Sequence, residues 1–326
     1  MKIEKTQEQK DGSFMRKISY VIPCYNSEHT IKTVVLGLKE MMKESLKEYR
    51  YEIILVNDGS PDNLHQVIKR ELDNDPCVHY IRLAKNFSQH NAVMAGLNHA
   101  CGDIIVCMDD DGQTSASEVP KLVRALNDEV DVAYAKYPQK KHSVFRNLGS
   151  KVNDYMLKIM LGKPSDLYIS SFFAIKSFVK DEMIKYYNPY PYLGGLILRI
   201  TNRVINVEVE HFDRNEGSSN YSLKKLLKLY VNGLTNFSVK PLRVSLTFSI
   251  LFAIIAFIFT IYLTINKLMN PTTPIGWTST MIVILIVGAA ITFLLGVIGE
   301  YIGRIYISIN KIPQYVEVRE NKKEEN

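Results

Sequence analysis

Three consecutive aspartates, Asp109, Asp110 and Asp111, follow the apolar run Ile104-Ile105-Val106-Cys107-Met108 and precede Gly112. The apolar run predicts a buried strand, and the glycine lets the backbone turn sharply beside a ligand. Neighbouring carboxylates repel one another by about 1 kcal/mol per pair even in water. A bound cation removes this cost, and such oxygen ligands suit Mg²⁺ or Mn²⁺ with coordination positions left for a substrate's phosphates. The alternative is a solvated acidic turn, and the position of the cluster must decide.

Strands and helices alternate along the chain that leads to this cluster. Strands are predicted at 18–22, 51–56, 78–83 and 103–108, with helices at about 27–47 and 88–100, the second capped by Ser88. This alternation predicts an α/β domain with a mostly parallel central sheet. Ligands bind such sheets at the C-terminal ends of the strands. Three loops therefore come together there: Pro23-Cys24-Tyr25-Asn26, Asn57-Asp58-Gly59-Ser60, and the aspartates.

The middle of the chain carries weaker signals. A helix is predicted at 146–161, strands at 170–175 and 204–212, and a polar loop at 213–220. Residues 221–239 place leucines at helical spacing on one side and lysines on another. This pattern is typical of an amphipathic helix at a bilayer surface, and a helix packed on the domain is the alternative.

Two long apolar runs follow. No charged residue occurs between Arg243 and Lys267, or between Trp277 and Glu300. Each run is long enough to span a bilayer core of roughly 30 Å as a helix. Lys and Arg flank the outer ends more than the connecting loop, so the positive-inside bias predicts that both termini are cytosolic.

The bulk composition restricts the possible functions. The net charge of +6 lies largely near the apolar runs and in the tail, which favours attraction to an anionic membrane and no nucleic-acid binding. The four cysteines form no CxxC pair, as expected of core residues in a reducing compartment. The sequence contains neither GxGxxG nor GxxxxGK[ST], the usual marks of dinucleotide and P-loop sites.

The motifs resemble those of family 2 GT-A glycosyltransferases. The resemblance rests on Val21-Ile22-Pro23-Cys24-Tyr25-Asn26, on Val56-Asn57-Asp58-Gly59-Ser60-Pro61-Asp62 and on Met108-Asp109-Asp110-Asp111-Gly112-Gln113. The later stretches 210–222 and 237–243 are similar to the polyisoprenyl-phosphate branch, which includes dolichol-phosphate mannose synthase and bacterial undecaprenyl-phosphate glucosyltransferases. With the two apolar runs, the resemblance covers about residues 17 to 315.

The resemblance implies functions for individual residues. Asp109, Asp111 and Gln113 would bind Mg²⁺ or Mn²⁺. The nucleotide-sugar and acceptor would contact Pro23, Tyr25, Asn26, Asp58, Asp110, Ser218, Ser219 and Tyr221. Arg146 and Arg214 would act in catalysis by contacting the diphosphate or the lipid phosphate. The structural alternatives are that the two arginines are solvated surface charges, that Tyr25 is a packed loop aromatic, and that Asp58 caps a helix or forms a turn.

The residue patterns and the resemblance together imply the organisation of the chain, and the resemblance implies its reaction. A disordered N-terminus (1–14) would precede a cytosolic GT-A nucleotide-diphospho-sugar transferase domain (15–220). This domain would be followed by an interfacial helix (221–240) and by a two-helix transmembrane hairpin within 241–300, with spans at about 244–266 and 278–299. The last part would be a cytosolic tail (301–326) that is disordered from Glu317. The enzyme would transfer a sugar with inversion, UDP-glucose being the favoured donor, to undecaprenyl phosphate at the inner membrane.

Further partners follow from that reaction. A flippase and a second glycosyltransferase would use the lipid-linked sugar for cell-envelope glycosylation, and the hairpin could support a homo-oligomer. GlcNAc, mannose and modified sugars remain alternative substrates.

The sequence departs from the family pattern at three places: Ser27 replaces a common glutamate, Thr114-Ser115-Ala116 replaces a proline pair, and Ser88 replaces a glycine. A processive polysaccharide synthase is disfavoured because its QxxRW motif is absent and the single tryptophan, Trp277, lies between the apolar runs. The DxDGT-like order at 109–114 also suggests a haloacid-dehalogenase-type phosphatase, and an inert membrane scaffold that retains the fold is a third rival interpretation.

Overall fold

The computed structural model describes residues 15–72, 74–112, 116–137, 164, 166–210, 276–310 and 312–318, together with residue 158 and scattered positions between 251 and 269. These residues belong to two compact units. The first unit comprises 1–154, 162–220 and 313–326, and the second comprises 155–161 and 221–312. The prediction of disorder in 1–14, the predicted helices at 146–161 and 221–239 and the polar loop at 213–220 fall outside the described residues, apart from residue 158.

One sheet forms the centre of the first unit. Its strands are β1 (Lys17–Cys24), β2 (Arg50–Asn57), β3 (Val78–Arg82), β4 (Ile104–Cys107), β5 (Val132–Lys136), β6 (Phe173–Lys176) and β7 (Val204–Glu208). The helices described around it are α1 (Ile31–Ser45), α2 (Leu64–Glu71), α3 (Gln89–His99), the short 3₁₀ turn η1 (Ala116–Glu118), α4 (Val119–Ala125), α6 (Ser177–Met183) and α7 (Leu193–Ile200).

The seven strands lie in the order β3-β2-β1-β4-β6-β5-β7. β1 pairs in parallel with β2 and β4, β2 with β3, and β5 with β7, whereas β6 runs antiparallel to both of its neighbours. The predicted α/β fold with a mostly parallel sheet is therefore confirmed. The chain leaves β1 toward β2 on one side and reaches β4 on the other, so the ends of β1 and β4 form the crevice where ligands bind in such sheets.

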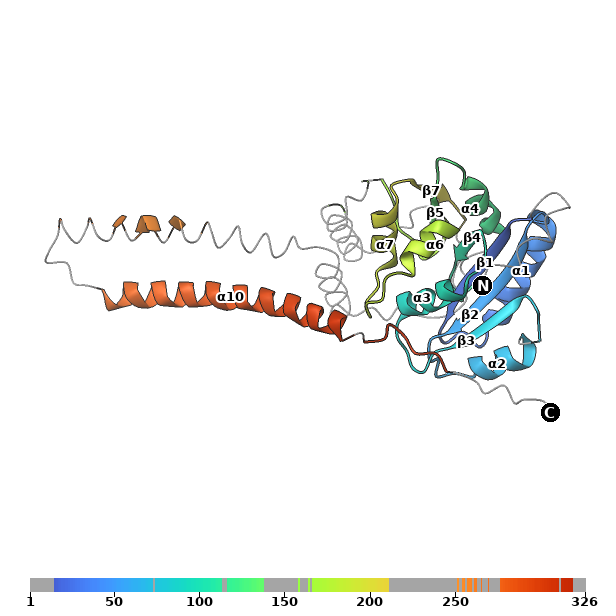
Figure 1. Cartoon of the computed structure of the whole chain (residues 1–326), viewed down its shortest axis with the longest axis horizontal. Helices are drawn as coiled ribbons and strands as arrows, with labels where there is room; N and C mark the ends of the chain where they lie inside the picture. Colours follow the sequence, from blue (N-terminus) through green and yellow to red (C-terminus); the bar gives the residue numbers. More distant parts are fainter. Residues whose placement is uncertain are drawn as a thin grey trace, which may run out of the picture. The chain divides into compact units, whose positions relative to one another are not determined.

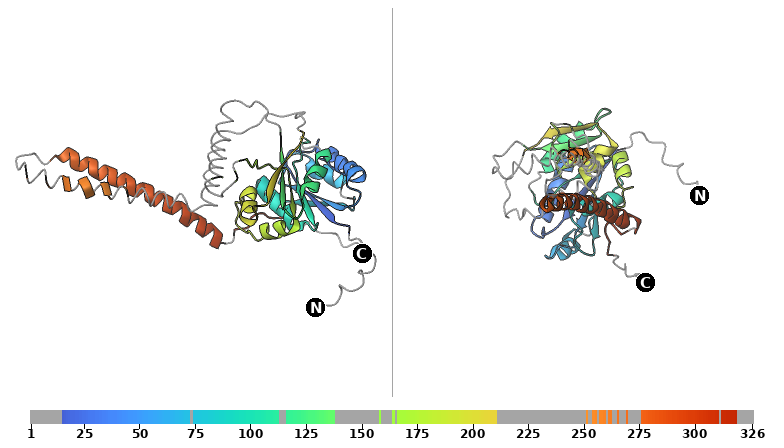
Figure 2. Two further views of the ribbon diagram at one scale, coloured as in Figure 1. Left: turned by 90° about the horizontal axis from the view of Figure 1, so that it is seen from above. Right: turned by 90° about the vertical axis from the view of Figure 1, so that its left-hand side faces the viewer.

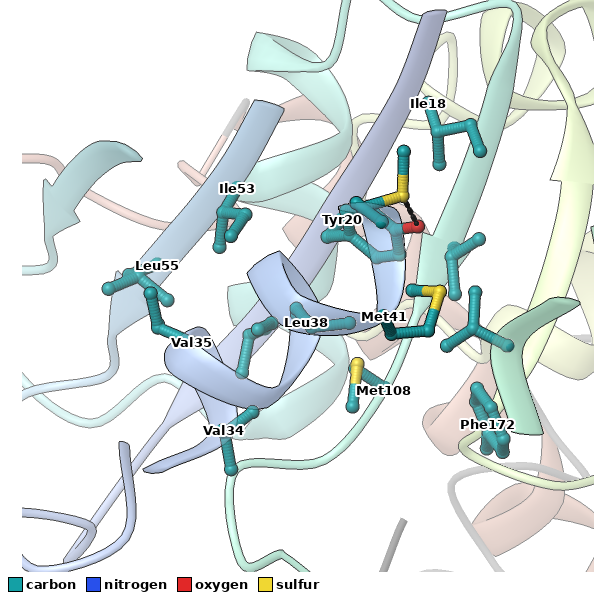
Figure 3. Packing of buried hydrophobic residues seen from close by; sticks show 14 of the residues in the cluster. Ile18, Tyr20, Val34, Val35, Leu38, Met41, Ile53, Leu55, Met108 and Phe172 are labelled. Atoms are coloured by element: carbon teal, nitrogen blue, oxygen red, sulfur yellow. Dashed lines mark hydrogen bonds between the residues drawn. The ribbon is translucent and has the colours of Figure 1, made fainter. Parts of the chain in front are cut away.

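Helix α1 covers one face of this sheet. Its apolar residues recur at helical spacing, and Val34, Val35, Leu38 and Met41 point toward Tyr20 and other strand side chains in Figure 3. Tyr20 is buried and satisfies its hydroxyl by donating to Met42 Sδ at 3.0 Å. Residues of α2 and α4 belong to the same buried cluster, so these helices share the face with α1.

Helix α3 packs on the opposite face against β1 and β2 (Figure 1). A Cβ at Gly96 would lie 2.4 Å from Val21 Cγ1 and 3.2 Å from Val56 Cγ2. Only a glycine allows this close approach of helix to sheet. Because α3 starts beside the carboxyl ends of these strands, the close packing also fixes the loop that precedes it.

The sequence-based elements differ from the structure in places. β5 was not predicted, although all but its last residue are buried, and neither were α6 and α7. The strands predicted at 170–175 and 204–212 are observed at Phe173–Lys176 and Val204–Glu208. Ser88 precedes α3 as predicted, but its side chain makes no capping hydrogen bond.

Helix α10 (Trp277–Ile309) is the long apolar helix of the second unit (Figure 2). Its window Ile286–Gly303 is long and apolar enough to cross a membrane, and none of that window is buried within the protein. The second predicted span, about 278–299, lies within α10, which continues ten residues further. Most of the first predicted span lies outside the described residues, and the described positions between 251 and 269 are helical.

The segment after α10 returns to the first unit. Glu317 forms a bridge with Leu83, and backbone hydrogen bonds run from Ala84 N to Val316 O and from Val318 N to Arg82 O, both 2.8 Å long. The prediction that disorder begins at Glu317 is therefore wrong for Glu317 and Val318. The sequence of this short segment did not indicate the pairing, because its partner, the edge strand β3, is far away along the chain.

Candidate active site

The sheet brings the three predicted loops to one edge. Cys24, the last residue of β1, pairs with Asn57, the last of β2, and Val21 pairs with Cys107, the last of β4. Asp58 N donates to Cys24 O at 3.0 Å. The turns that follow β1, β2 and β4 therefore begin side by side, and they carry Tyr25, Asp58 and the aspartates.

Asp110 joins the aspartate cluster to the turn after β1. Its Oδ2 accepts a hydrogen bond from Tyr25 N at 2.8 Å, and its carbonyl accepts one from Thr30 Oγ1 at 2.6 Å. Burial raises the pKa of Asp110 to about 6, an effect that the Ser27 hydroxyl and the Tyr25 amide partly offset. The middle aspartate thus positions the first loop.

Asp109 is held by two side chains from elsewhere in the chain. Gln89 Nε2 donates to Oδ1 at 2.7 Å, and Ser171 Oγ donates to Oδ2 at 2.5 Å. Burial raises the pKa of Asp109, and the nearby charge of Asp111 raises it further. Gln89 begins α3 and Ser171 precedes β6, so two further segments of the chain contribute to the site beside the three turns. Neither residue was predicted from the sequence, and only the polar loop beside each strand or helix could have indicated them.

Asp58 occupies the turn after β2. Its side chain is 2% exposed and accepts a hydrogen bond from Phe87 N at 2.7 Å. Burial raises the pKa of Asp58 to about 6, although hydrogen bonds from the backbone amides of Phe87 and Ser88 offset part of this rise. A Cβ on Gly59 would lie 2.4 Å from the carbonyl carbon of Lys85, and Gly59 has φ 62°. The Asp58 turn and the loop before α3 therefore form one tightly packed wall.

The turn after β1 adopts a backbone conformation that suits its residue. Asn26 has φ 56°, in the left-handed region that asparagine tolerates better than most residues. The backbone amide of Asn26 donates to Ser60 Oγ at 2.8 Å, and Ser60 Oγ donates to Asp62 Oδ1 at 2.5 Å. Glu28 Oε2 accepts a hydrogen bond from Asn63 N at 2.8 Å. These bonds fasten the first loop to the second.

The remaining predicted site residues are placed as follows. Pro23 is buried inside β1, Tyr25 is 46% exposed, and Asp111 is partly exposed beside Gly112, which has φ 70°. Gln113, Arg146, Arg214, Ser218, Ser219 and Tyr221 lie outside the described residues. Within the described ranges, no group of three or more His, Cys, Asp or Glu side chains is arranged to hold a metal.

The predicted metal set combines two carboxylates with the Gln113 amide, so only part of it is described. Its chemistry nevertheless fits a divalent cation, because oxygen is the donor atom that Mg²⁺ and Mn²⁺ prefer. The raised pKa of Asp109 also favours a bound cation at this site. A desolvated carboxylate next to another carboxylate is costly as an anion, and a cation would offset that cost.

Two family models match the sequence. The model of glycosyl transferase family 2 matches residues 19–182, and the model of the GtrB C-terminal hairpin matches residues 240–305. The first match includes all three turns of the site, and the second includes most of α10. These matches argue against the phosphatase interpretation.

Individual relatives agree over nearly the whole chain. An uncharacterized glycosyltransferase, YkcC, of Bacillus subtilis is 32% identical over 91% of this chain and 92% of its own. Undecaprenyl-phosphate 4-deoxy-4-formamido-L-arabinose transferase of Yersinia pestis is 30% identical over 92% of each chain. Glucosyl-3-phosphoglycerate synthase from Mycobacterium tuberculosis, solved with Mn²⁺ and UDP-glucose, has a TM-score of 0.50 at 16% identity and covers 68% of this chain and 79% of its own.

That last likeness concerns the fold alone, and it agrees with the GT-A arrangement of the sheet. The acidic strand end, the family match and the full-length relatives all lead to one assignment: this chain belongs to glycosyl transferase family 2.

Proposed function

We propose that the protein transfers a sugar from a nucleotide-sugar to a polyisoprenyl phosphate in the membrane, with undecaprenyl phosphate as the acceptor. The observation that carries this proposal is the convergence of Asp58, Asp109 and Asp110 at the carboxyl edge of the sheet, in a chain that continues into the apolar helix α10. The Yersinia relative, named for transfer to undecaprenyl phosphate, supports the same acceptor.

The residues divide between donor and acceptor. Pro23, Tyr25, Asn26 and Asp58 would form the nucleotide site, while Asp109, Asp111 and Gln113 would bind Mg²⁺ or Mn²⁺. When bound, the metal neutralises the charge of the departing nucleotide diphosphate. Arg146 and Arg214 would contact phosphate groups, and Ser218, Ser219 and Tyr221 would shape the acceptor site.

The chemistry we propose is a single displacement with inversion at the anomeric carbon. The phosphate acceptor is already anionic at neutral pH, so its oxygen can attack without a strong general base. Positioning then supplies much of the acceleration. Gln89 and Ser171 contribute to it by fixing both oxygens of Asp109, and Asp110 contributes by holding the backbone of Tyr25.

We also propose which nucleotide-sugar serves as the donor. UDP-glucose is the donor we favour, and GlcNAc or mannose donors are alternatives. A modified pentose is a specific alternative, because the Yersinia relative is named for 4-deoxy-4-formamido-L-arabinose. We place the enzyme in the bacterial inner membrane with its catalytic domain in the cytosol, where it would supply lipid-linked sugar to a flippase and to a second glycosyltransferase for cell-envelope glycosylation.

The experiment measures radiolabel transfer from a panel of UDP- and GDP-sugars to polyprenyl phosphate in detergent, with and without EDTA. We expect one donor to give a lipid-extractable product that EDTA abolishes. The Asp111→Asn variant should lose this transfer while still inserting into membranes, because an amide binds a divalent cation more weakly than a carboxylate does. Full transfer by that variant would contradict the metal assignment. A folded wild-type protein that labels no lipid from any donor would instead support the inert-scaffold interpretation.

A further inference from the structure

The turn between α6 and α7 exposes aromatic side chains. It reads Tyr186-Tyr187-Asn188-Pro189-Tyr190, and Tyr187 is 78% exposed and Tyr190 50% exposed. Tyrosine combines an apolar ring with a polar hydroxyl, and it is enriched where proteins meet the membrane–water interface. A turn that holds such rings outward therefore resembles an interfacial contact.

This turn is held in place from two sides. Gln314, which is 9% exposed, donates from Nε2 to Asn188 O at 2.9 Å and to Tyr186 O at 3.4 Å. From the other side, Asn91 Nδ2 of α3 donates to Pro189 O at 3.2 Å. A turn fixed in this way loses little conformational entropy when its exposed rings contact a surface.

The chain itself ties this turn to the end of the apolar helix. α10 ends at Ile309, and only four residues separate that end from Gln314. Five residue steps span at most about 18 Å even when fully extended. If α10 crosses the bilayer, covalent connection alone keeps Gln314, to which the Tyr186–Tyr190 turn is hydrogen-bonded, within that reach of the end of the helix.

The local charge is compatible with an anionic surface. The two acids within residues 177–192, Asp181 and Glu182, each lie beside a lysine: Lys180 Nζ is 2.7 Å from Asp181, and Lys185 Nζ is 2.5 Å from Glu182. The turn therefore presents no uncompensated negative charge that anionic lipid headgroups would repel.

We propose that Tyr187 and Tyr190 contact the headgroup region of the bilayer. This inference rests on the membrane anchoring in the proposed function, and it specifies which surface of the catalytic unit faces the lipid. The turn bonds to Asn91 in α3, and α3 begins with Gln89, the partner of Asp109. Contact at the turn would therefore hold the donor site at the depth of the acceptor's phosphate.

The test uses the full-length protein with a single reporter indole. In a Trp277→Phe background, which removes the only native tryptophan, Tyr187→Trp or Tyr190→Trp is reconstituted into phosphatidylcholine–phosphatidylglycerol vesicles. The phosphatidylcholine is either unlabelled or brominated near the head of its acyl chains. Leu36→Trp is the matched control, because Leu36 is 53% exposed on α1, which covers the face of the sheet opposite α3.

We expect brominated lipid to quench the indole at position 187 or 190 by about twofold or more, and to leave the Leu36→Trp indole unchanged. Equal, weak quenching at positions 187, 190 and 36 would overturn the proposal. The measurement needs neither donor nor turnover. Failure of lipid-linked sugar synthesis would therefore count against the proposed function alone, and the quenching would still report on the turn.

Discussion

Asp110 differs from its neighbours in the cluster because its carboxylate accepts a hydrogen bond from a backbone amide, that of Tyr25. We expect Asp110→Ala to lower kcat/KM by about tenfold, since an unsatisfied amide costs roughly 1–3 kcal/mol, and the Tyr25 amide would lose its acceptor. Asp110→Asn keeps an acceptor oxygen and should lose much less. Steady-state transfer kinetics of both variants check this. A loss in Asp110→Asn as severe as that in Asp111→Asn would show that the middle aspartate acts through its charge.

Asp58 provides a pH-dependent prediction. Burial raises its pKa to about 6, whereas an unfolded aspartate has a pKa near 3.9. Between these values the folded protein binds more protons than the unfolded chain, so stability falls as pH rises through this range. Ionised Asp58 therefore lowers the stability at neutral pH, and acidification to below about pH 4 removes that penalty.

We expect Asp58→Asn to increase the free energy of unfolding at neutral pH by on the order of 1–3 kcal/mol, because the amide oxygen can still accept from Phe87 N. The difference from wild type should disappear at acidic pH. Thermal unfolding in detergent at both pH values measures this. The same variant should bind the nucleotide-sugar less tightly if Asp58 contacts the nucleotide, and a stabilisation independent of pH would contradict the titration argument.

The convergence of Asp58 and the aspartates followed from the sequence, since the carboxyl ends of neighbouring parallel strands meet at one edge. Gln89 and Ser171 did not follow, although they bind both oxygens of Asp109. Neither residue stands in a motif of charged or metal-binding type, and the contact of Ser171 with Asp109 depends on the pairing of β4 with β6. That pairing is antiparallel, as is the next one between β6 and β5, and local periodicity carries no information about it.

At the scale of elements, the loop before α3 contains a strained residue. Ser88 has φ 85° and ψ 154°, a conformation that costs a residue other than glycine about 1–3 kcal/mol. We expect Ser88→Gly to raise the midpoint of thermal unfolding, because glycine adopts this backbone without a clash. Ser88→Ala, which keeps the Cβ and loses only the hydroxyl, should not raise it. An equal rise in both variants would assign the effect to the hydroxyl and contradict the strain argument.

The strands that alternate clearly with helices, β1 to β4, were predictable from the apolar runs bounded by turn residues. β5 was not, because its short run Val132-Ala133-Tyr134-Ala135 follows acidic residues and is buried only through its pairing with β6 and β7. α7 was missed for a related reason. It contains Gly194 and Gly195, which disfavour a helix locally, and the packing against α6 stabilises it instead.

At the scale of the whole molecule, the return of the chain after α10 constrains the membrane topology. Residues 316–318 pair with Arg82 and Ala84 in the catalytic unit, so a second unit that enters the membrane, as we propose, would have the chain before it and the chain after it on the same side. A chain that starts and ends on the same side crosses an even number of times. If α10 crosses once, the preceding apolar run must cross too, which is the predicted first span at about 244–266.

This topology makes a prediction for cysteine accessibility in intact cells. We expect a membrane-impermeant maleimide to label Thr272→Cys, which lies between the apolar runs, without permeabilisation. Asn321→Cys should be labelled only after permeabilisation, as should the native Cys101, which is exposed on the catalytic unit and serves as the internal control. The physical reason is that Lys and Arg at the outer ends of the runs keep both ends in the cytosol. Labelling of Asn321→Cys in intact cells would require that the tail crosses the membrane, and it would then be incompatible with the pairing of Glu317 and Leu83.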